Sequence, residues 1–338
     1  MSKFATPPAV AIVGATGAVG QQLLACLERR KFALSHLRLA ASARSAGKVL
    51  RFRDRTIAVD ALEARTFDGI DIALFSAGSD ISRKYAPAAV AAGAVVIDNS
   101  SAFRMDESVP LVIPEINSRE IARHCGIIAN PNCAAIVAIT PLWAIHRRNR
   151  VRRLIVSTYQ AASGGGAAAM EELIDSTRAF LGGRNLKPVA LPHPYAFNLF
   201  SHNTPIDHTK GYNAEEIKAM RETKKIFDDD EIRVSFTCIR VPVLRAHSVS
   251  LSFTCERAIA PDEVRAVLAG APGVRIVDDA ARNHFPMPLD ASGQDDILVG
   301  RIRQDLSDPD GRSITWFAAG DQLLKGAALN AVQIAERL

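Results

Sequence analysis

Residues 9–20 read Ala-Val-Ala-Ile-Val-Gly-Ala-Thr-Gly-Ala-Val-Gly, and this stretch decides the fold of the chain. Its first five residues form the continuous apolar run expected of a parallel strand buried on both faces. The glycine turn follows at once, and after it Leu23, Leu24 and Leu27 give a helix one apolar face. A strand, a glycine turn and a helix in this order form a dinucleotide-binding unit, whose glycines let the backbone approach a pyrophosphate. The spacing here is G-x-x-G-x-x-G rather than G-x-G-x-x-G.

The second predicted strand, His36 to Ala41, indicates which dinucleotide binds. In an NAD site an acidic residue ~20 residues after the glycines usually accepts hydrogen bonds from the ribose hydroxyls. Here residues 42–48 read Ser-Ala-Arg-Ser-Ala-Gly-Lys and contain no acid. Arg44, Ser45 and Lys48 offer a guanidinium, a hydroxyl and an ammonium to a 2′-phosphate, so the sequence favours NADP over NAD. The alternative is a solvated basic loop, because Arg and Lys are commonly exposed.

Strands and helices continue to alternate up to about residue 131. We predict strands at 70–75, 94–97 and 127–129 and a helix at 82–92. This order is typical of an α/β protein with a Rossmann-type, doubly wound parallel sheet. Beyond residue 133 the chain changes character, and we predict longer strands of an α+β domain with a mixed sheet at 151–159, 232–241 and 248–255. The final segment, 323–338, is again predicted to be helical.

The composition narrows the class of protein. With 338 residues and 48% apolar content, the chain can bury a large core in two domains. The net charge is +5, but 36 acidic residues are interspersed among 41 basic ones, which indicates an anionic substrate or cofactor rather than nucleic acid. The five cysteines are scattered without a Cys-x-x-Cys pair, which argues against a disulfide framework and a zinc site. We find no signal-peptide or membrane-spanning run, and expect a cytoplasmic protein.

The stretch Asn130-Pro131-Asn132-Cys133 precedes the apolar residues 134–139, which places Cys133 at the start of a predicted helix. Unpaired backbone N–H groups and the positive end of the helix dipole stabilise a thiolate there and lower its pKa from ~8.5. The same N–H groups suit an oxyanion. Pro131 keeps Asn130 extended, and Asn132 is a good N-cap. The alternative is that Cys133 is simply a small, buried, apolar residue, as free cysteines commonly are.

Six motifs together resemble the bacterial aspartate-semialdehyde dehydrogenases, in order and over nearly the whole chain. They are Gly14 to Gly20, Asp98 to Arg104, Asn130 to Cys133, Gln160 to Gly166, Arg240 to Val243, and His247-Ser248. The resemblance implies the NADP-dependent, reversible conversion of 4-phospho-L-aspartate to L-aspartate 4-semialdehyde and phosphate through a cysteine thioester. This reaction serves lysine, threonine, methionine and diaminopimelate biosynthesis. The resemblance also implies a homodimer or a dimer of dimers.

The resemblance assigns roles to the residues of the predicted site. Cys133 is the nucleophile beside Asn132, Gln160 orients the acyl group, and His247, which stands at a turn before a predicted strand, moves protons. The substrate residues are Arg240 for the carboxylate, Glu215 for the amine, and Arg104 and Lys218 for the phosphate. For Arg104 and Lys218 the alternative is an ordinary surface charge.

The cofactor residues implied by the resemblance are Gly14, Thr16, Gly17, Ala18, Val19, Arg44, Ser45, Ser76, Ser163, Gly164 and Gln322. The glycines after Ser163 permit close approach to the nicotinamide, or form a mere turn before a helix predicted at 167–180. The implied domains are an NADP-binding Rossmann domain over 1–131 and 320–338, and a catalytic, substrate-binding and dimerisation domain over 132–319.

Two other functions remain open at this point. The related N-acetyl-gamma-glutamyl-phosphate reductases share the cysteine chemistry, but Asn132, where that family usually has glycine, and the amine partner Glu215 argue against them. A non-catalytic NADP-binding regulatory protein is the second, and it would have no need to keep Cys133, His247 and Arg240. His202 and His208 suggest a metal, but without a third ligand or helical spacing we expect none. Their loop, 201–211, is the part least covered by the resemblance.

Overall fold

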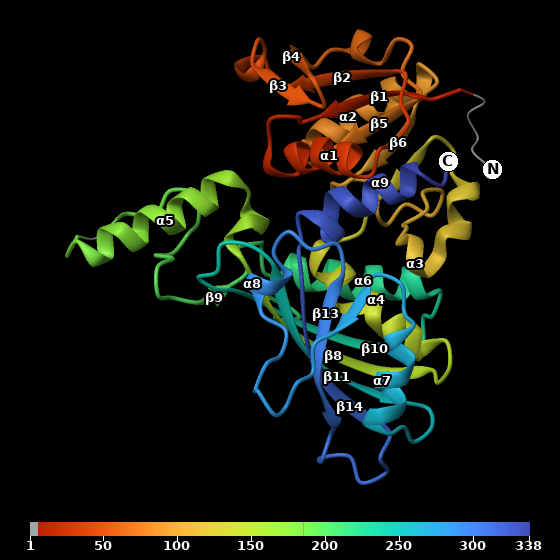
Figure 1. The fold of residues 1–338 in the computed structure, drawn as a ribbon, viewed down its shortest axis with the longest axis vertical. Helices are drawn as coiled ribbons and strands as arrows, with labels where there is room; N and C mark the ends of the chain where they lie inside the picture. The colour runs from red at the N-terminus through yellow and green to blue at the C-terminus, as the bar shows by residue number, and fades with distance from the viewer. Residues whose placement is uncertain (1–5, 185) are drawn as a thin grey trace. The chain divides into compact units, whose positions relative to one another are not determined.

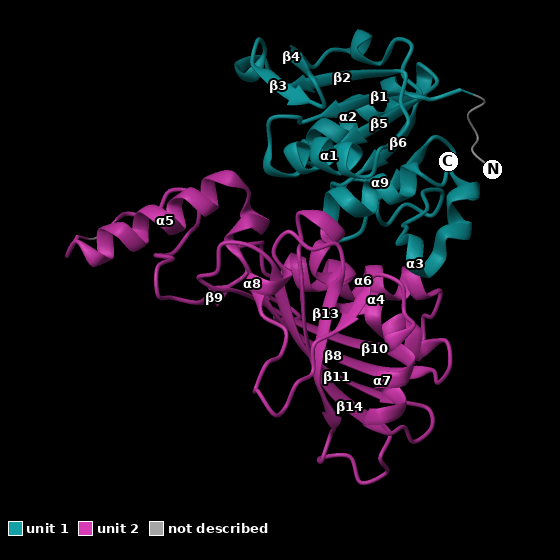
Figure 2. Cartoon of the chain, viewed as in Figure 1, with its two compact units in different colours: residues 1–132, 327–338 teal, residues 133–326 magenta. Residues whose placement is uncertain are grey.

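A computed structural model describes residues 6–184 and 186–338, which divide into two compact units (Figure 2). Unit 1 contains the chain up to residue 132 together with 327–338, and unit 2 contains residues 133–326. Cys133 is therefore the first residue of unit 2. No helix in the described part of the chain is long and apolar enough to cross a membrane.

Within the described residues of unit 1, seven strands form one sheet in the order β3-β4-β2-β1-β5-β6-β7 (Figure 1). Their bounds are β1 Ala9–Val13, β2 His36–Ala41, β3 Val49–Phe52, β4 Arg55–Ala61, β5 Ile72–Phe75, β6 Val95–Asp98 and β7 Ile127–Ala129. All neighbours are parallel except β3 and β4, which form an antiparallel hairpin at one edge. The Rossmann-type fold is confirmed, with this hairpin as an addition to the predicted parallel sheet.

The helices of unit 1 are α1 Ala18–Arg29, α2 Ser79–Ala91, α3 Pro114–Asn117 and α9 Leu329–Ala335, with single 3₁₀ segments at Ala43–Ser45, Ala64–Phe67 and Ser118–Arg123. Every residue of β1 is buried, as expected for a strand covered on both faces. Ala86 and Ala89 of α2 pack against one face of the sheet. The carboxyl end of the chain returns to this unit, where α9 contacts α1 and Glu336 pairs with Arg30 at 2.6 Å.

The sheet of unit 2 is mixed, as predicted, and runs in the order β12-β13-β14-β11-β8-β10-β9 among its described residues (Figure 1). The strands are β8 Val151–Gln160, β9 Phe200–Ser201, β10 Arg233–Arg240, β11 His247–Cys255, β12 Val274–Ile276, β13 Ile297–Gln304 and β14 Ser313–Gly320. β8 is parallel to β10 and antiparallel to β11. The carboxyl ends of β8 and β10 therefore lie at the same edge of the sheet as the beginning of β11.

The helices of unit 2 are α4 Cys133–His146, α5 Ala167–Leu181, α6 Ala214–Phe227, α7 Pro261–Ala269 and α8 Pro288–Ala291. Helices α4, α6 and α7 pack against the sheet, and α4 is apolar enough that residues 134–142 are all buried. α5 extends away from the sheet (Figure 1). Glu172 of α5 accepts hydrogen bonds from the backbone N–H groups of residues 189–191, which ties the following segment to this helix. A π-helical segment, Leu324–Ala328, precedes α9.

Candidate active site

The glycine turn of unit 1 is built so tightly that it needs its glycines. Gly14 has a φ of +83°, and a Cβ there would lie 2.7 Å from the carbonyl oxygen of Ser76. A Cβ on Gly20 would lie 2.2 Å from the carbonyl oxygen of Gly14. Ser76 follows β5, the parallel neighbour of β1, and its hydroxyl donates to the carbonyl of Val13 at 3.1 Å. Gly14 and Ser76 therefore lie together at the carboxyl ends of the parallel strands, where dinucleotides bind in this fold.

The start of α1 can receive an anion. Gly17 is its N-cap, and no side chain among the described residues caps this end of the helix. The first-turn N–H groups, which begin with Ala18 and Val19, and the helix dipole favour a phosphate there.

The segment after β2 carries the residues predicted to select NADP. Ser45 is buried, and its Oγ accepts a hydrogen bond from Thr16 of the glycine turn at 3.3 Å. Arg44 lies in the 3₁₀ segment Ala43–Ser45 with its side chain exposed. An exposed guanidinium on a segment joined to the glycine turn suits a 2′-phosphate.

Arg104 is buried in unit 1, so the alternative that it is an ordinary surface charge is wrong. Its Nε donates to the carbonyl of Asn130, and its Nη2 donates to the carbonyl of Asn99, each at 2.9 Å. Asn130 in turn accepts from Asn330 of α9 at 2.6 Å. These hydrogen bonds hold the guanidinium of Arg104 between the segments that follow β6 and β7.

Cys133 begins α4 in unit 2, as the sequence predicts, and its side chain is partly exposed. Cys26, Cys238 and Cys255 are fully buried, and burial raises the pKa of the Cys238 thiol well above its usual value. Space beside Cys133 depends on a glycine, because a Cβ on Gly326 would lie 2.9 Å from the Cβ of Cys133. Partial exposure at a helix amino terminus is the environment of a reactive thiol rather than of a packed one.

His247 is the first residue of β11 and is completely buried, whereas the sequence predicted a turn before the strand. The backbone N–H of Ala161 donates to its Nδ1 at 3.0 Å, so the ring proton must be on Nε2. Burial lowers the pKa of His247 well below its usual value, and the positive charge of Arg240 lowers it further. Nε2 has no hydrogen-bond partner among the described residues. The ring is therefore a neutral imidazole with one N–H to donate.

Gln160 and Arg240 end the parallel strands β8 and β10 and are directly paired in register. Both side chains are buried. The Nη1 of Arg240 donates to the carbonyl of Ala161 at 3.2 Å, and its Nη2 donates to Nε2 of His202 at 2.9 Å. Within the described residues, Nε2 of Gln160 and Nε of Arg240 have no partner. Buried donors without partners are rare, and these two lie at the end of the sheet where β11 begins with His247.

The glycine loop predicted to lie near the nicotinamide packs directly on these residues. A Cβ on Gly164 would lie 2.9 Å from Nη1 of Arg240 and 2.9 Å from Nε2 of His247. Gln322 fixes the loop, because its Nε2 donates to Ser163 and its Oε1 accepts from the backbone N–H of Ala246 at 3.0 Å. A Cβ built on Gly326 would also lie 3.1 Å from the Cβ of Gln322, so Gln322 and Cys133 both lie close to this glycine.

Glu215 and Lys218 lie in the first turns of α6, which begins at the N-cap Asn213. Glu215 is buried and Lys218 is half-buried. Their charges act on His202 together with that of Arg240. The pKa of His202 is lowered to about 4, chiefly by burial and further by Arg240 and Lys218, while Glu215 opposes this shift. The structure thus brings the predicted carboxylate, amine and phosphate residues of unit 2 around one buried histidine that sequence analysis considered only as a metal ligand.

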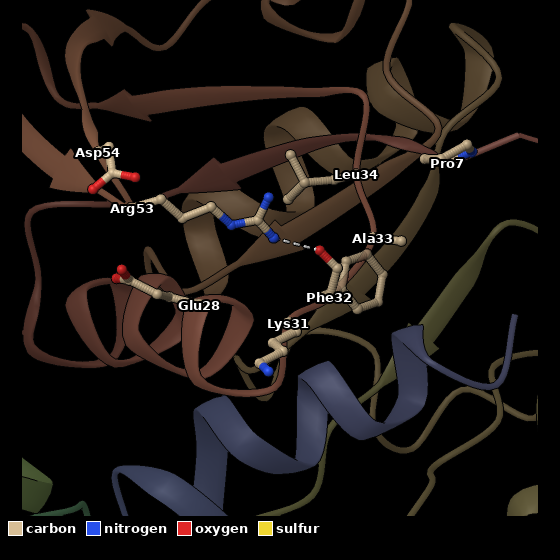
Figure 3. Close-up of a pocket in the computed structure, with 8 residues that line it drawn as sticks. All are labelled: Pro7, Glu28, Lys31, Phe32, Ala33, Leu34, Arg53 and Asp54. Carbon is tan, nitrogen blue, oxygen red and sulfur yellow. Dashed lines mark hydrogen bonds between the residues drawn. The ribbon is translucent and has the colours of Figure 1, made fainter.

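One pocket of unit 1 lies apart from the predicted site residues. The pocket is lined by residues from the end of α1 and the turn between β3 and β4, among them Phe32 and Arg53, whose Nη2 donates to the carbonyl of Phe32 at 2.7 Å (Figure 3). None of the predicted site residues lines it. In residues 6–184 and 186–338, no group of three His, Cys, Asp or Glu side chains is placed to hold a metal ion.

Comparisons with known proteins agree over nearly the whole chain. The model of the semialdehyde dehydrogenase NAD binding domain matches residues 9–124, and that of the semialdehyde dehydrogenase dimerisation domain matches residues 142–325. The aspartate-semialdehyde dehydrogenase of Synechocystis is 50% identical over 98% of this chain and 98% of its own length. That of Bacillus subtilis is 44% identical over 97% of this chain and 96% of its own length.

Solved structures give the same result. The crystal structure of aspartate semialdehyde dehydrogenase II from Vibrio cholerae, complexed with ASA, superposes with a TM-score of 0.95 at 40% identity. The superposition covers 99% of this chain and 98% of the Vibrio cholerae chain. A probable aspartate-semialdehyde dehydrogenase from Pseudomonas aeruginosa superposes with a TM-score of 0.90 at 30% identity, over 98% of both chains.

Proposed function

This chain belongs to the aspartate-semialdehyde dehydrogenase family, and we propose that it performs the family's reaction with Cys133 as the nucleophile. The protein is an NADP-dependent oxidoreductase of amino-acid biosynthesis that interconverts 4-phospho-L-aspartate with L-aspartate 4-semialdehyde and phosphate. The observation that best supports our assignment of the site is the set of buried, unpartnered donors on Gln160, Arg240 and His247 in the described part of unit 2. Three such donors at one sheet edge fit an anionic, oxygen-rich substrate.

In the biosynthetic direction we assign the first step to the thiolate of Cys133. It forms a bond to the acyl carbon, the C–O bond to phosphate breaks, and a thioester remains. The amino terminus of α4 stabilises the thiolate, because Cys133 is the first residue of the helix and the positive end of the helix dipole lies there. His247 already holds its one proton on Nε2, so it contributes a hydrogen bond rather than removing the thiol proton.

The thioester is then reduced and the aldehyde released. NADPH supplies the hydride, and the residues present fit its binding: the glycine turn, the uncapped start of α1 and Arg44 with Ser45 in unit 1. We assign Ser163, Gly164 and Gln322 to the nicotinamide side of the cofactor. The Nε2–H group of His247 donates to the negative charge that develops on the acyl oxygen, as does the amide of Gln160. Sulfur leaves when the thiohemiacetal collapses.

Substrate recognition rests on opposite charges. We assign the substrate carboxylate to Arg240, whose planar guanidinium can bind it through two parallel hydrogen bonds. The substrate amine is assigned to Glu215, and the phosphate to Lys218 and Arg104. A free amine matched by a buried carboxylate distinguishes this substrate from an acylated one, and it favours aspartate semialdehyde over N-acetyl-glutamate semialdehyde. We find no observation that favours a non-catalytic function.

The protein forms dimers through its second unit. We propose that the contact includes the sheet face opposite to α4, α6 and α7, where Ile155 and Tyr159 of β8 are more than one-third exposed. The apolar side chains Phe180, Val189 and Phe197, on and after α5, are exposed as well. Assembly into a dimer of dimers stays a prediction. We also propose a cytoplasmic location, because all five cysteines lie in the described part of the chain and none forms a disulfide.

A direct assay tests the proposed function. The purified protein is mixed with NADP, phosphate and L-aspartate 4-semialdehyde, and in parallel with N-acetyl-glutamate semialdehyde. We expect phosphate-dependent formation of NADPH with the first aldehyde at a kcat/KM at least 10²-fold higher than with the second. Equal rates, or a preference for the acetylated aldehyde, would contradict the assignment.

A further inference from the structure

His202 makes a direct contact with the predicted carboxylate-binding arginine. β9 pairs antiparallel with β10, with Phe200 opposite Arg240, and this register carries the next residues of the loop alongside β10. The backbone N–H of His202 donates to the carbonyl of Cys238 at 2.9 Å, which fixes the loop there. The imidazole is nine-tenths buried, and its Nε2 lies 2.9 Å from Nη2 of Arg240.

The chemistry of this contact determines where the proton of His202 is. A guanidinium has only donors, so Nε2 of His202 must accept and must carry no proton. The ring proton is therefore on Nδ1, which lies 3.3 Å from Oγ1 of Thr204. Thr204 donates onward to Oδ1 of Asn213 at 3.4 Å and accepts from the backbone N–H of Glu215 at 3.1 Å. One line of hydrogen bonds thus runs from Arg240 to the amino terminus of α6.

A neutral acceptor serves a substrate-binding arginine better than an acid does. A carboxylate in the place of His202 would orient the guanidinium but would also cancel its charge before the substrate arrives. The imidazole orients the group and leaves its full charge. The carbonyl of Ala161 holds the other terminal nitrogen at 3.2 Å, and Nε remains without a partner among the described residues.

We propose that His202 is a positioning residue for Arg240: its Nε2 accepts from Nη2 and holds the guanidinium in the orientation that binds the substrate carboxylate. The relay through Thr204 and Asn213 fixes this orientation relative to Glu215, which binds the substrate amine. This inference rests on the proposed function, because it takes Arg240 as the carboxylate-binding residue.

Steady-state kinetics of three His202 variants test the inference. In H202A the acceptor is lost, so we expect KM for L-aspartate 4-semialdehyde to rise 10- to 100-fold while kcat stays within about 3-fold. In H202Q the amide oxygen replaces Nε2, and KM should return to within about 5-fold of the wild type. In H202E an acceptor is present but the charge of Arg240 is cancelled, and KM should stay at least 10-fold high.

His208→Ala is the matched control, since His208 is an exposed histidine of the same loop, and its kinetics should equal those of the wild type. The proposal is wrong if H202Q is as impaired as H202A, if H202E matches H202Q, or if H202A lowers kcat and leaves KM unchanged. Each result would show that the ring does not act as a neutral hydrogen-bond acceptor, but through packing or in some other way.

A spectroscopic measurement on the wild-type protein tests the same geometry without turnover and without a variant that must fold. Long-range ¹H–¹⁵N correlation of the histidine rings at pH 7.5 should show the Nδ1–H form for His202 and the Nε2–H form for His247. An Nε2–H or doubly protonated His202 would overturn the proposal. If the wild type gave this signature but did not turn over L-aspartate 4-semialdehyde, the proposed function would fail and the contact with Arg240 would stand.

Discussion

The backbone N–H of Ala161 donates a 3.0 Å hydrogen bond to Nδ1 of His247, and this one contact fixes the proton of the ring on Nε2. A ring in this form can donate from Nε2, and it cannot accept a proton there. Because burial and the charge of Arg240 also lower the pKa of His247, the ring stays neutral in the working range of pH. The catalytic role that follows is hydrogen-bond donation.

His247→Gln and His247→Ala separate donation from proton removal. The amide of Gln retains an N–H near the position of Nε2, so we expect it to keep at least 10-fold more kcat than Ala. His247→Ala should lower kcat by roughly 10²- to 10⁴-fold with a small change in KM. We expect the pH profile of kcat/KM to be the same in the wild type and in His247→Gln, because His247 does not ionise near pH 6.5. Loss of an ionisation limb in the variant would assign a base role to the ring.

Arg240→Lys keeps a positive charge and loses the planar fork. The substrate carboxylate has the same charge in the ground and transition states, so Arg240 contributes mainly uniform binding. We expect KM for the semialdehyde to rise at least 10-fold and kcat to change less, as measured by initial rates at saturating NADP and phosphate. A fall in kcat with an unchanged KM would show that Arg240 acts in the chemical step instead.

Arg44→Ala tests the choice of cofactor. A charge-assisted contact to the 2′-phosphate is worth about 1.5 to 3 kcal/mol, so the dissociation constant for NADP should rise roughly 10- to 100-fold while that for NAD changes little. Titration calorimetry with each cofactor gives both values. Arg55→Ala serves as the control, because Arg55 is an exposed arginine of the edge hairpin. Equal losses for NADP and NAD would remove the assignment of Arg44.

The stability of the fold should depend on pH through its buried neutral histidines. His202 has a pKa of about 4 in the folded protein against 6.5 for an ordinary histidine, and burial also lowers the pKa of His146. Between pH 6.5 and about 4 the unfolded chain binds a proton at His202 and the folded chain does not. The free energy of unfolding therefore falls with falling pH, by about 1.4 kcal/mol per pH unit through His202, and the lowered pKa of His146 acts in the same direction.

Denaturant unfolding of the wild type and H202Q between pH 7.5 and 5 checks this expectation. H202Q removes one titrating group, so its free energy of unfolding should fall less steeply over the same range. Parallel curves for the two proteins would show that His202 does not titrate as its burial and charges indicate.

Local signals in the sequence predicted much of the fold. The apolar run of β1, the glycine turn and the start of α4 at Cys133 all depend on neighbouring residues, and the structure has them where they were expected. The hairpin of β3 and β4 was not predicted, because its strands lie at an exposed edge and mix apolar with charged residues. The helix predicted over 82–92 begins three residues earlier, at Ser79.

The site was harder to derive, because its contacts join residues far apart in the chain. The partner of His202 is Arg240, 38 residues later, and only the register of β9 on β10 brings them together. The backbone contact of His247 joins residues still farther apart in sequence, since Ala161 lies 86 residues before it. The sequence pointed to both histidines as candidates. The positions of their ring protons, on which their roles depend, could be assigned only from the structure.

The central claim is that Cys133 carries the acyl group, and one measurement tests it most directly. The wild-type protein and Cys133→Ser are mixed with NADP and L-aspartate 4-semialdehyde without phosphate, quenched in acid and analysed by peptide mass spectrometry. We predict an aspartyl adduct on Cys133 and a burst of NADPH in the wild type. Cys133→Ser should bind NADP with unchanged affinity and show neither. An adduct on another cysteine, or turnover by Cys133→Ser, would contradict the account.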